Sequence, residues 1–221
     1  PTEQAMRQLI LGVGPAVDEL GLSLTETVAL LDVQIGAVLS DRRLAIDETR
    51  ALLRADRRRL LSLMTGADQA RIARSWRAVW FYRWSQYHYG RGRRNIGRLF
   101  WHANLFLTGA DICPVSDFGP GLVIVSPQGV TLFVVAGANL TVHGQTAVGG
   151  GRSNADIGAG PGRPLLGDHV VLEHGAVVLG PVKIGDRARI GAGCVVMTDV
   201  APDTTLEVAP PEFAQRKSRH A

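Results

Sequence analysis

An apolar residue recurs at every sixth position through the second half of this 221-residue chain. Neither an α-helix, which repeats every 3.6 residues, nor a half-buried strand, which repeats every two, produces a period of six. A coil whose turns have three sides of six residues does produce it. The series runs Ile112, Phe118, Ile124, Val130, Ala136, Val142, Val148 and, after a gap, Leu166, Leu172, Val178, Ile184, Ile190 and Val196. This period predicts a left-handed parallel β-helix of hexapeptide repeats over residues 110–211.

Two further residue sets keep the same period. Glycines that often follow the periodic residue are Gly119, Gly137, Gly149, Gly167, Gly185 and Gly191. We expect them at tight corners that need backbone freedom. Small or apolar residues four positions after the periodic one are Val170, Ala176, Val182, Ala188, Cys194 and Val200. Membership of this second set predicts that Cys194 lies in the core.

The period fails at two positions, Asn154 and Gly160, which lie in the stretch GGGRSNADIGAGPGRP. We expect this glycine-rich stretch to leave the coil as a loop between two regular runs. A phosphate-binding loop is the alternative, although the stretch matches neither G-x-x-x-x-G-K-[ST] nor the dinucleotide fingerprint. Loops that leave a repeat scaffold commonly carry function, because the coil faces present repetitive surface.

The first half of the chain has apolar residues at the three-to-four spacing of a helix. The pattern predicts helices over TETVALLDVQIGAVL, over TRALLRADRRRLLSLM and, after a break at Gly66, over residues 67–89. Asp47 or Thr49 is expected to start the second of these. The predicted fold class is α+β, with a helical domain at 1–109, the β-helix at 110–211 and a C-terminal tail at 212–221.

Composition and charge limit the kinds of protein that this chain can be. The two cysteines lie far apart and fit no metal-ligand spacing, so we expect neither a disulfide nor a bound metal. The sequence shows no apolar run of eighteen residues and no secretory signal pattern, so a cytoplasmic protein is expected. The net charge is +4, with arginines dense at 57–59 and 91–94. We interpret these as solvated helix faces or subunit contacts, with nucleic acid or an anionic ligand as alternatives.

Residues 110–211, with the lead-in from Tyr82, resemble serine acetyltransferase and its hexapeptide-repeat relatives. The segments that carry the resemblance are YRWSQYHYGRGRR, DICP, GPGLVI, AVGGG and RPLLGDHVVLEHGAVVLGPVKIGDRARIGAGCVVMTDVAPDTT. The resemblance implies a homotrimer or a dimer of trimers, with active sites between neighbouring subunits. It also implies an acyl-CoA as donor and a histidine as general base on the acceptor hydroxyl, whose pKa is far above neutral.

The sequence departs from the family where the family's histidines stand. Alignment of GPGLVIVSPQG places Ser126 at the general-base histidine and Val125 at the acidic residue before it. Arg163, ahead of Pro164, replaces the second histidine.

Two more family motifs are altered. Asp111 matches the aspartate of the motif D-I-H-P, which orients the base, but Cys113 replaces the histidine of that motif. Val208 in LEVAPP has no glycine before it, unlike the family's G-V-P-A turn. The catalytic aspartate and the CoA contacts near the C-terminus therefore need a different arrangement here.

The candidate catalytic residues are Asp111, Ser126, His143 and Arg163. Ser126 cannot act as a general base, so it is a nucleophile, a hydrogen-bonding group or a plain corner residue. Arg163 suits a substrate carboxylate or a CoA phosphate, with an exposed loop arginine as the alternative. His143, one rung before the glycine-rich loop, is the best-placed replacement for the missing base, and an ordinary exposed imidazole is the alternative.

CoA contacts are expected at Gly149, Gly150, Gly175, Lys183, Ala192 and Gly193. His169 and His174 lie on consecutive rungs, where a metal site is a minor alternative. The predicted function is acyl-CoA-dependent transfer, of acetyl or another acyl group, to the hydroxyl or amine of a small amino-acid-like acceptor. The alternatives are a catalytically inactive trimeric binding or scaffold protein, and an enzyme of different chemistry on the same fold.

Overall fold

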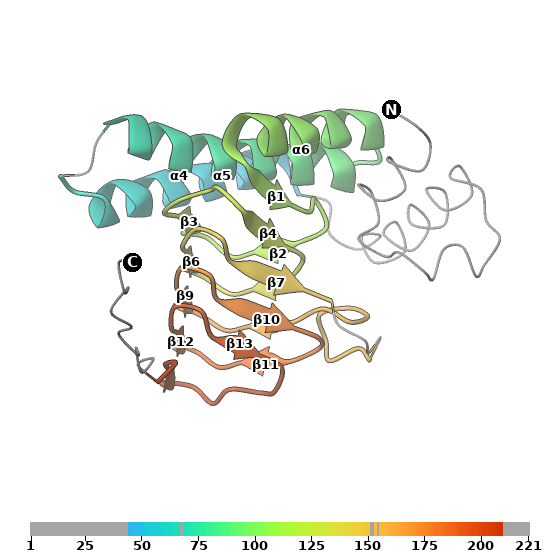
Figure 1. The fold of residues 1–221 in the computed structure, drawn as a ribbon. Helices are drawn as coiled ribbons and strands as arrows, with labels where there is room; N and C mark the ends of the chain where they lie inside the picture. The colour runs from blue at the N-terminus through green and yellow to red at the C-terminus, as the bar shows by residue number, and fades with distance from the viewer. Residues whose placement is uncertain (1–43, 67–68, 151–152, 154, 210–221) are drawn as a thin grey trace, which may run out of the picture. The chain divides into compact units, whose positions relative to one another are not determined.

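The computed structural model describes residues 44–66, 69–150, 153 and 155–209. Within these residues three helices precede a coil of short strands, and the helices lie together at one end of the coil (Figure 1). The helices are α4 (Ile46–Leu63), α5 (Gln69–Gly90) and α6 (Arg94–Thr108). The helix predicted over TETVALLDVQIGAVL and the tail at 212–221 lie outside the described residues.

Helix α4 confirms the second predicted helix but begins at a different residue. Ala45 is its N-cap, and the hydroxyl of Thr49 donates to the carbonyl oxygen of Ala45 at 3.1 Å. The prediction that Asp47 or Thr49 starts the helix was therefore wrong. Asp47 and Glu48 lie in the first turn instead, where their negative charges favour the positive end of the helix dipole.

Helix α5 matches the predicted helix at 67–89, whereas α6 was not predicted as a separate helix. Gly66 precedes α5 with a φ of +81°, a left-handed conformation that glycine adopts readily. Gly109 ends α6 in the same way, with a φ of +79° and its amide donating to the carbonyl of Leu105. The first strand begins directly afterwards, at Ala110.

The strands form three parallel sheets, one on each side of the coil. The first sheet contains β1 (Ala110–Ile112), β4 (Val130–Leu132), β7 (Ala147–Gly149), β10 (Val177–Leu179) and β13 (Val195–Val196). The second sheet contains β2 (Asp117–Phe118), β5 (Val135–Ala136), β8 (Leu165–Leu166) and β11 (Lys183–Ile184). The third sheet contains β3 (Val123–Ile124), β6 (Thr141–Val142), β9 (Val171–Leu172), β12 (Arg189–Ile190) and β14 (Thr205–Leu206). The predicted β-helix is confirmed.

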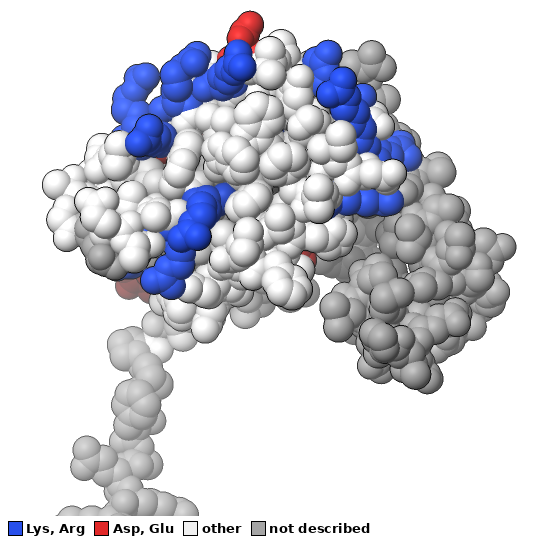
Figure 2. Space-filling view, turned by 90° about the horizontal axis from the view of Figure 1, so that it is seen from above, with Lys and Arg blue, Asp and Glu red and all other residues white. Residues whose placement is uncertain are grey.

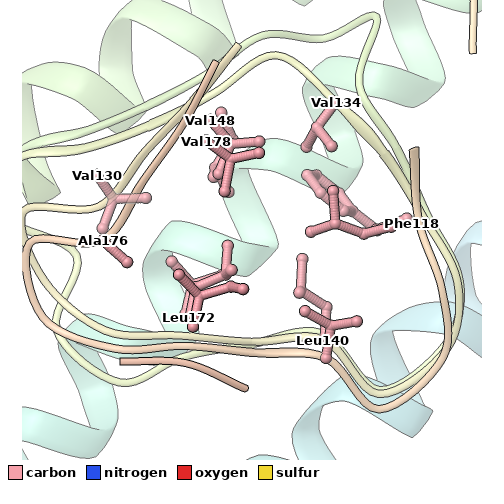
Figure 3. Packing of buried hydrophobic residues seen from close by; sticks show 14 of the residues in the cluster. Phe118, Val130, Val134, Leu140, Val148, Leu172, Ala176 and Val178 are labelled. Atoms are coloured by element: carbon pink, nitrogen blue, oxygen red, sulfur yellow. The ribbon is translucent and has the colours of Figure 1, made fainter. Parts of the chain in front are cut away.

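The periodic residues fill the inside of the coil, and Figure 3 shows their side chains converging from the three sheets. All thirteen apolar members of the predicted series are buried, and so is Cys194, which is 8% exposed. Ala78, Val79 and Tyr82 of α5 belong to the same cluster. The helices and the coil therefore share one core, and the division into domains at residue 109 stays a prediction.

The register differs from a strict count of six at one place. Ile112 pairs with Leu132, and Leu132 pairs with Val148, so Leu132 rather than Val130 continues this inward column. Val130 pairs with Ala110 and is buried beside the column. The connection from β3 to β4 is two residues longer than the period of six requires, and the connection from β4 to β5 is two residues shorter. The two differences cancel, so the period of six is restored at Ala136.

The glycines that follow the periodic residues allow the next rung to pass close to their backbone, and backbone freedom is not the reason for them. A Cβ on Gly185 would lie 2.3 Å from the nitrogen of Pro202, and one on Gly119 would lie 2.7 Å from the amide nitrogen of Ala138. Neither glycine has a positive φ. The expectation of conformational freedom was wrong here: the next rung passes so close that no side chain fits.

The helices bond directly to the first turn of the coil. Asp56 of α4 and Arg83 of α5 form a fully buried ion pair, with Nε and Oδ2 at 2.9 Å. Arg83 also donates to the carbonyl oxygens of Phe118 and Gly119. Oδ1 of Asp56 accepts the amide of Gly121 at 2.7 Å and that of its neighbour Leu122 at 2.8 Å. The ion pair therefore joins both helices to the backbone of the coil.

The glycine-rich stretch leaves the coil as predicted. Phe118 pairs with Ala136, eighteen positions on, whereas Ala136 pairs with Leu166, thirty positions on. The twelve additional residues follow β7 and return before β8. Strands on both sides of the loop remain paired, so the coil continues without a gap.

Candidate active site

The predicted site residues gather at two different corners of the coil. The corner that leads from the third sheet to the first carries Ser126, His143, Gly175, Ala192 and Gly193. The edge and corner that lead from the first sheet to the second carry Asp111, Gly149, Gly150 and Arg163. Lys183 lies apart from both, in β11 of the second sheet. Within one chain, Ser126 and Arg163 therefore stand on opposite sides of the first sheet.

The hydroxyl of Ser126 is hydrogen-bonded to a neighbouring glutamine. Its Oγ donates to Oε1 of Gln128 at 2.8 Å, and the hydroxyl lies 3.2 Å from where a Cβ on Gly144 would be. Gly144 directly follows His143, so Ser126 and the imidazole occupy neighbouring rungs of one corner. Among the described residues no imidazole is hydrogen-bonded to Ser126. This arrangement suits a hydrogen-bonding role better than that of an activated nucleophile.

His143 follows β6 and is held by its backbone. Its amide donates to the carbonyl of Leu172 at 2.9 Å, and its own carbonyl accepts the hydroxyl of Thr146 at 2.8 Å. Thr146 also donates to the carbonyl of Glu173 at 3.1 Å, which ties the two rungs together. His143 is half-buried. The imidazole therefore projects from a fixed stretch of backbone.

The pKa of His143 is lowered from its ordinary value, chiefly because burial disfavours the charged imidazolium. The negative charge of Glu173 opposes this and raises the pKa. The positive charges of Arg189, Arg71 and His174 lower it further. The net result is a neutral imidazole at neutral pH, which is the form that accepts a proton.

Glu173 is the acidic group of this corner and was not singled out from the sequence. Its Oε1 forms an ion pair with Nη2 of Arg189, and its Oε2 accepts the amide of Ala192 at 3.1 Å. Glu173 follows β9 as His143 follows β6, and Val142 pairs with Leu172 in these strands. The two side chains are thus neighbours on adjacent rungs although thirty positions separate them. To predict that His143 and Glu173 are neighbours, one needs the length of the glycine-rich loop between them. The period of six alone does not give that length.

Asp111 and Cys113 lie together at the other edge of the first sheet. Oδ1 of Asp111 accepts the indole N–H of Trp101 from α6 at 2.7 Å. Burial raises the pKa of the Cys113 thiol to about 12. The thiol of Cys113 therefore stays protonated at neutral pH and cannot serve as the missing proton acceptor.

Arg163 is buried, with 5% of its surface exposed, so the alternative of a solvent-exposed loop arginine was wrong. Its guanidinium lies over the ring of Phe133 at 5.5 Å, and its Nη1 donates to the carbonyl of Val115 at 2.9 Å. Its Nε has no hydrogen-bond partner among the described residues. The side chain fastens the end of the glycine-rich loop to the coil. Substrate binding by Arg163 stays a prediction.

The residues predicted to contact CoA differ in their surroundings. Gly175 and Gly193 have φ values of +71° and +70° at the corner that carries His143. Lys183 is exposed, and its amide donates to Oδ1 of Asp199 at 2.8 Å. Gly150 is exposed and close to the loop, since a Cβ there would lie 3.8 Å from the carbonyl oxygen of Gly162. Their roles in CoA binding stay predictions.

Three other histidines contact neighbouring side chains. The ring of His169 contacts Nδ2 of Asn139, and its φ is +59°. His88 stacks on Phe100 between α5 and α6, while His102 stacks on Trp101. Within the described ranges, no three His, Cys, Asp or Glu side chains come together in a way that could hold a metal ion.

Arginines spread over the helical end of the molecule (Figure 2). Arg57 and Arg58 are exposed, as expected of a solvated face. Arg59 is not, because it donates to the carbonyl oxygens of Gly121 at 2.6 Å and Leu140 at 2.9 Å. None of the helices that the structure describes is at once long and apolar enough to span a lipid bilayer.

Comparison with known proteins finds a family match within the repeats. Residues 163–197 match the family described as bacterial transferase hexapeptide (six repeats). Serine acetyltransferase of Mycobacterium tuberculosis is 36% identical over 136 residues, which is 60% of this chain and 57% of that protein. Serine acetyltransferase of Synechococcus elongatus is 38% identical over 114 residues, 50% of this chain and 45% of that protein. The chain thus spans about half the length of the curated relatives it matches.

Solved structures show the same fold. Serine acetyltransferase of Neisseria gonorrhoeae, in complex with serine, superposes with a TM-score of 0.64 at 24% identity, over 76% of this chain and 69% of that one. A serine acetyltransferase in complex with CoA superposes with a TM-score of 0.64 at 18% identity, over 72% and 67% of the two chains. By its repeats, its relatives and its coil, this chain is similar to the serine acetyltransferases and contains repeats of the bacterial hexapeptide transferase type.

Proposed function

We propose that the chain is an acyl-CoA-dependent acyltransferase that acts on the hydroxyl or amine of a small amino-acid-like acceptor, with His143 as general base. The similarity to serine acetyltransferases supports the reaction class. The related structures with bound CoA and bound serine support the donor and the acceptor class. The family resemblance also suggests a trimer or a dimer of trimers, in which corners of neighbouring subunits meet.

The observation that carries the proposal is that His143, whose pKa is lowered by burial, lies one rung from Ser126 on the same corner of the coil. A base must be unprotonated at the working pH and must lie near the reacting groups. Burial supplies the first condition by lowering the pKa of His143. The shared corner supplies the second, because Ser126 stands where the family resemblance puts the base.

The reaction then follows from ordinary acyl-transfer chemistry. The acceptor oxygen or nitrogen attacks the carbonyl carbon of the thioester while His143 takes its proton. The carbon–sulfur bond breaks, and the CoA thiolate leaves and receives the proton from the imidazolium. Ser126 is in a position to hydrogen-bond to the acceptor or to the thioester oxygen, and an amine acceptor would need the base less than a hydroxyl.

The test is turnover of acetyl-CoA with a panel of amino acids and amines, measured as release of free thiol. We expect one acceptor class to raise the rate above the hydrolysis background. The His143→Ala variant should lower kcat/KM by about a hundredfold or more, which is the usual contribution of a general base. The matched control is His169→Asn, because asparagine tolerates the positive φ of this exposed corner residue.

Two results would contradict the proposal. One is thiol release that no acceptor raises above background, and the other is a His143→Ala variant that behaves like the control. The second candidate function is a binding or scaffold protein, which the burial of Arg163 favours, because its guanidinium is already engaged by the carbonyl of Val115 and the ring of Phe133. Acetyl-CoA binding by calorimetry without turnover would favour a different acceptor, whereas an intact trimer that binds no CoA would support the scaffold.

A further inference from the structure

The surroundings of His143 contain an ionic pair that neither the period nor the family resemblance indicates. Glu173 and Arg189 lie on successive rungs of the third sheet, and their side chains form an ion pair. The inference below rests on the proposed role of His143 as a base.

The geometry of Glu173 is fixed from three directions. Arg189 holds Oε1, the amide of Ala192 holds Oε2 at 3.1 Å, and the backbone carbonyl accepts the hydroxyl of Thr146 at 3.1 Å. The side chain of Glu173 is only 25% exposed, whereas that of Arg189 is 53% exposed. The carboxylate therefore keeps a fixed place beside the rung of His143, where adjacent parallel strands lie about 4.8 Å apart.

In the described part of the chain, the charged groups that act on the pKa of His143 come from three elements. Glu173 and His174 follow β9, Arg189 lies in β12, and Arg71 lies in α5. Glu173 is the single negative charge in this set, and the other three groups repel a proton from the imidazole. The ion pair with Arg189 weakens the effect of Glu173 on His143, because the two charges oppose each other.

We propose that Glu173 is a positioning residue for the base His143 and that Arg189 and the amide of Ala192 hold it in place. Glu173 keeps enough negative charge near the imidazole for it to accept a proton from the acceptor. Arg189 limits that effect, so that the imidazole remains unprotonated before the reaction. The pair thus sets the pH range over which the base works.

Opposed substitutions test this pair. Glu173→Gln keeps the shape and the contact with Ala192 but removes the charge, so the protonation midpoint of His143 should fall by about half a pH unit to one unit. Arg189→Gln leaves the charge of Glu173 uncompensated, so the midpoint should rise by a similar amount. The midpoint is read from the NMR chemical shift of the His143 ring in the full chain, assigned by its loss in His143→Ala.

The matched control is a second Arg–carboxylate pair with the same sixteen-residue separation on the same coil. Arg187 and Asp203 are 57% and 62% exposed, and neither charge acts on His143. Asp203→Asn should leave the midpoint unchanged. The proposal fails if Glu173→Gln and Arg189→Gln move the midpoint in the same direction, or if neither moves it more than Asp203→Asn does.

Turnover separates this inference from the proposed function. With an active acceptor, the acidic limb of kcat/KM against pH should move to lower pH in Glu173→Gln and to higher pH in Arg189→Gln. A merely structural role would change the rate without moving the limb. Shifted midpoints in a chain that never turns over acetyl-CoA would remove the proposed function alone, whereas turnover with unmoved midpoints would remove the inference alone.

Discussion

At the scale of single residues, burial decides which candidate groups can react. His143 and Cys113 are both affected by desolvation, but with opposite chemical results. Burial keeps the imidazole neutral, and a neutral imidazole is a base. Burial also keeps the thiol neutral, and a neutral thiol is a poor nucleophile. Burial therefore lowers the pKa of His143 and raises that of Cys113.

The folded chain should protect Cys113 from alkylation. A rise of the thiol pKa from 9.0 to about 12 lowers the thiolate fraction at about pH 8 by roughly a thousandfold. We therefore expect iodoacetamide to leave Cys113 unmodified in the native chain and to modify it in urea, as read by peptide mass spectrometry. Equal rates in the two states would contradict the burial of this thiol.

At the scale of elements, the buried ion pair of Asp56 and Arg83 joins the helices to the coil. Asp56 meets Arg83 and two backbone amides, and both side chains of the pair are fully buried. Removing one partner of such a pair leaves an uncompensated buried charge. The attachment of α4 and α5 should therefore be sensitive to a single substitution.

Asp56→Ala should lower the free energy of unfolding by about 3–5 kcal/mol. Asp47→Ala is the matched control in the same helix, because its contact with Arg50 is exposed and such pairs contribute less than about 1 kcal/mol. Urea denaturation followed by circular dichroism gives both values. Similar losses in the two variants would rule out a special role for the buried pair.

The elements also show what the sequence could and could not predict. The period of six gave the coil, and the helical spacing gave α4 and α5. Helix α6 was not recognised because Gly92 and Gly97 surround its start and resemble a break. In the structure Gly97 lets α6 approach α5 closely, since a Cβ there would lie 2.9 Å from that of Tyr89.

The candidate site was harder to predict for a related reason. His143 and Glu173 become neighbours only because the coil continues across a loop of irregular length. Local sequence patterns do not predict a pairing between residues so far apart in the chain. The alternative of an exposed Arg163 was wrong because a loop composition does not reveal that Phe133 lies beneath its guanidinium.

At the scale of the whole molecule, the coil is a stack in which each rung contacts the next. The spacing between rungs is so tight at some corners that a single methyl group cannot be placed there. Gly185 is such a corner, because it faces the backbone of Pro202.

Gly185→Ala should destabilise the folded chain by about 1–3 kcal/mol, as overpacking of a rigid site does. Gly150→Ala is the control, since the nearest atom to the added Cβ is 3.8 Å away and its φ is not positive. Thermal unfolding followed by calorimetry compares the two. Equal stability of both variants would show that the rungs can separate without penalty.

The bonds between the helices and the first turn have one further consequence. A parallel coil ends in backbone donors and acceptors that another strand could extend, as happens in fibres. Here Arg83 already takes the carbonyl oxygens of Phe118 and Gly119, and Asp56 takes the amide of Gly121. Those groups offer no template to a second molecule. The helical layer thus works as a terminator that keeps the stack from polymerising at this end.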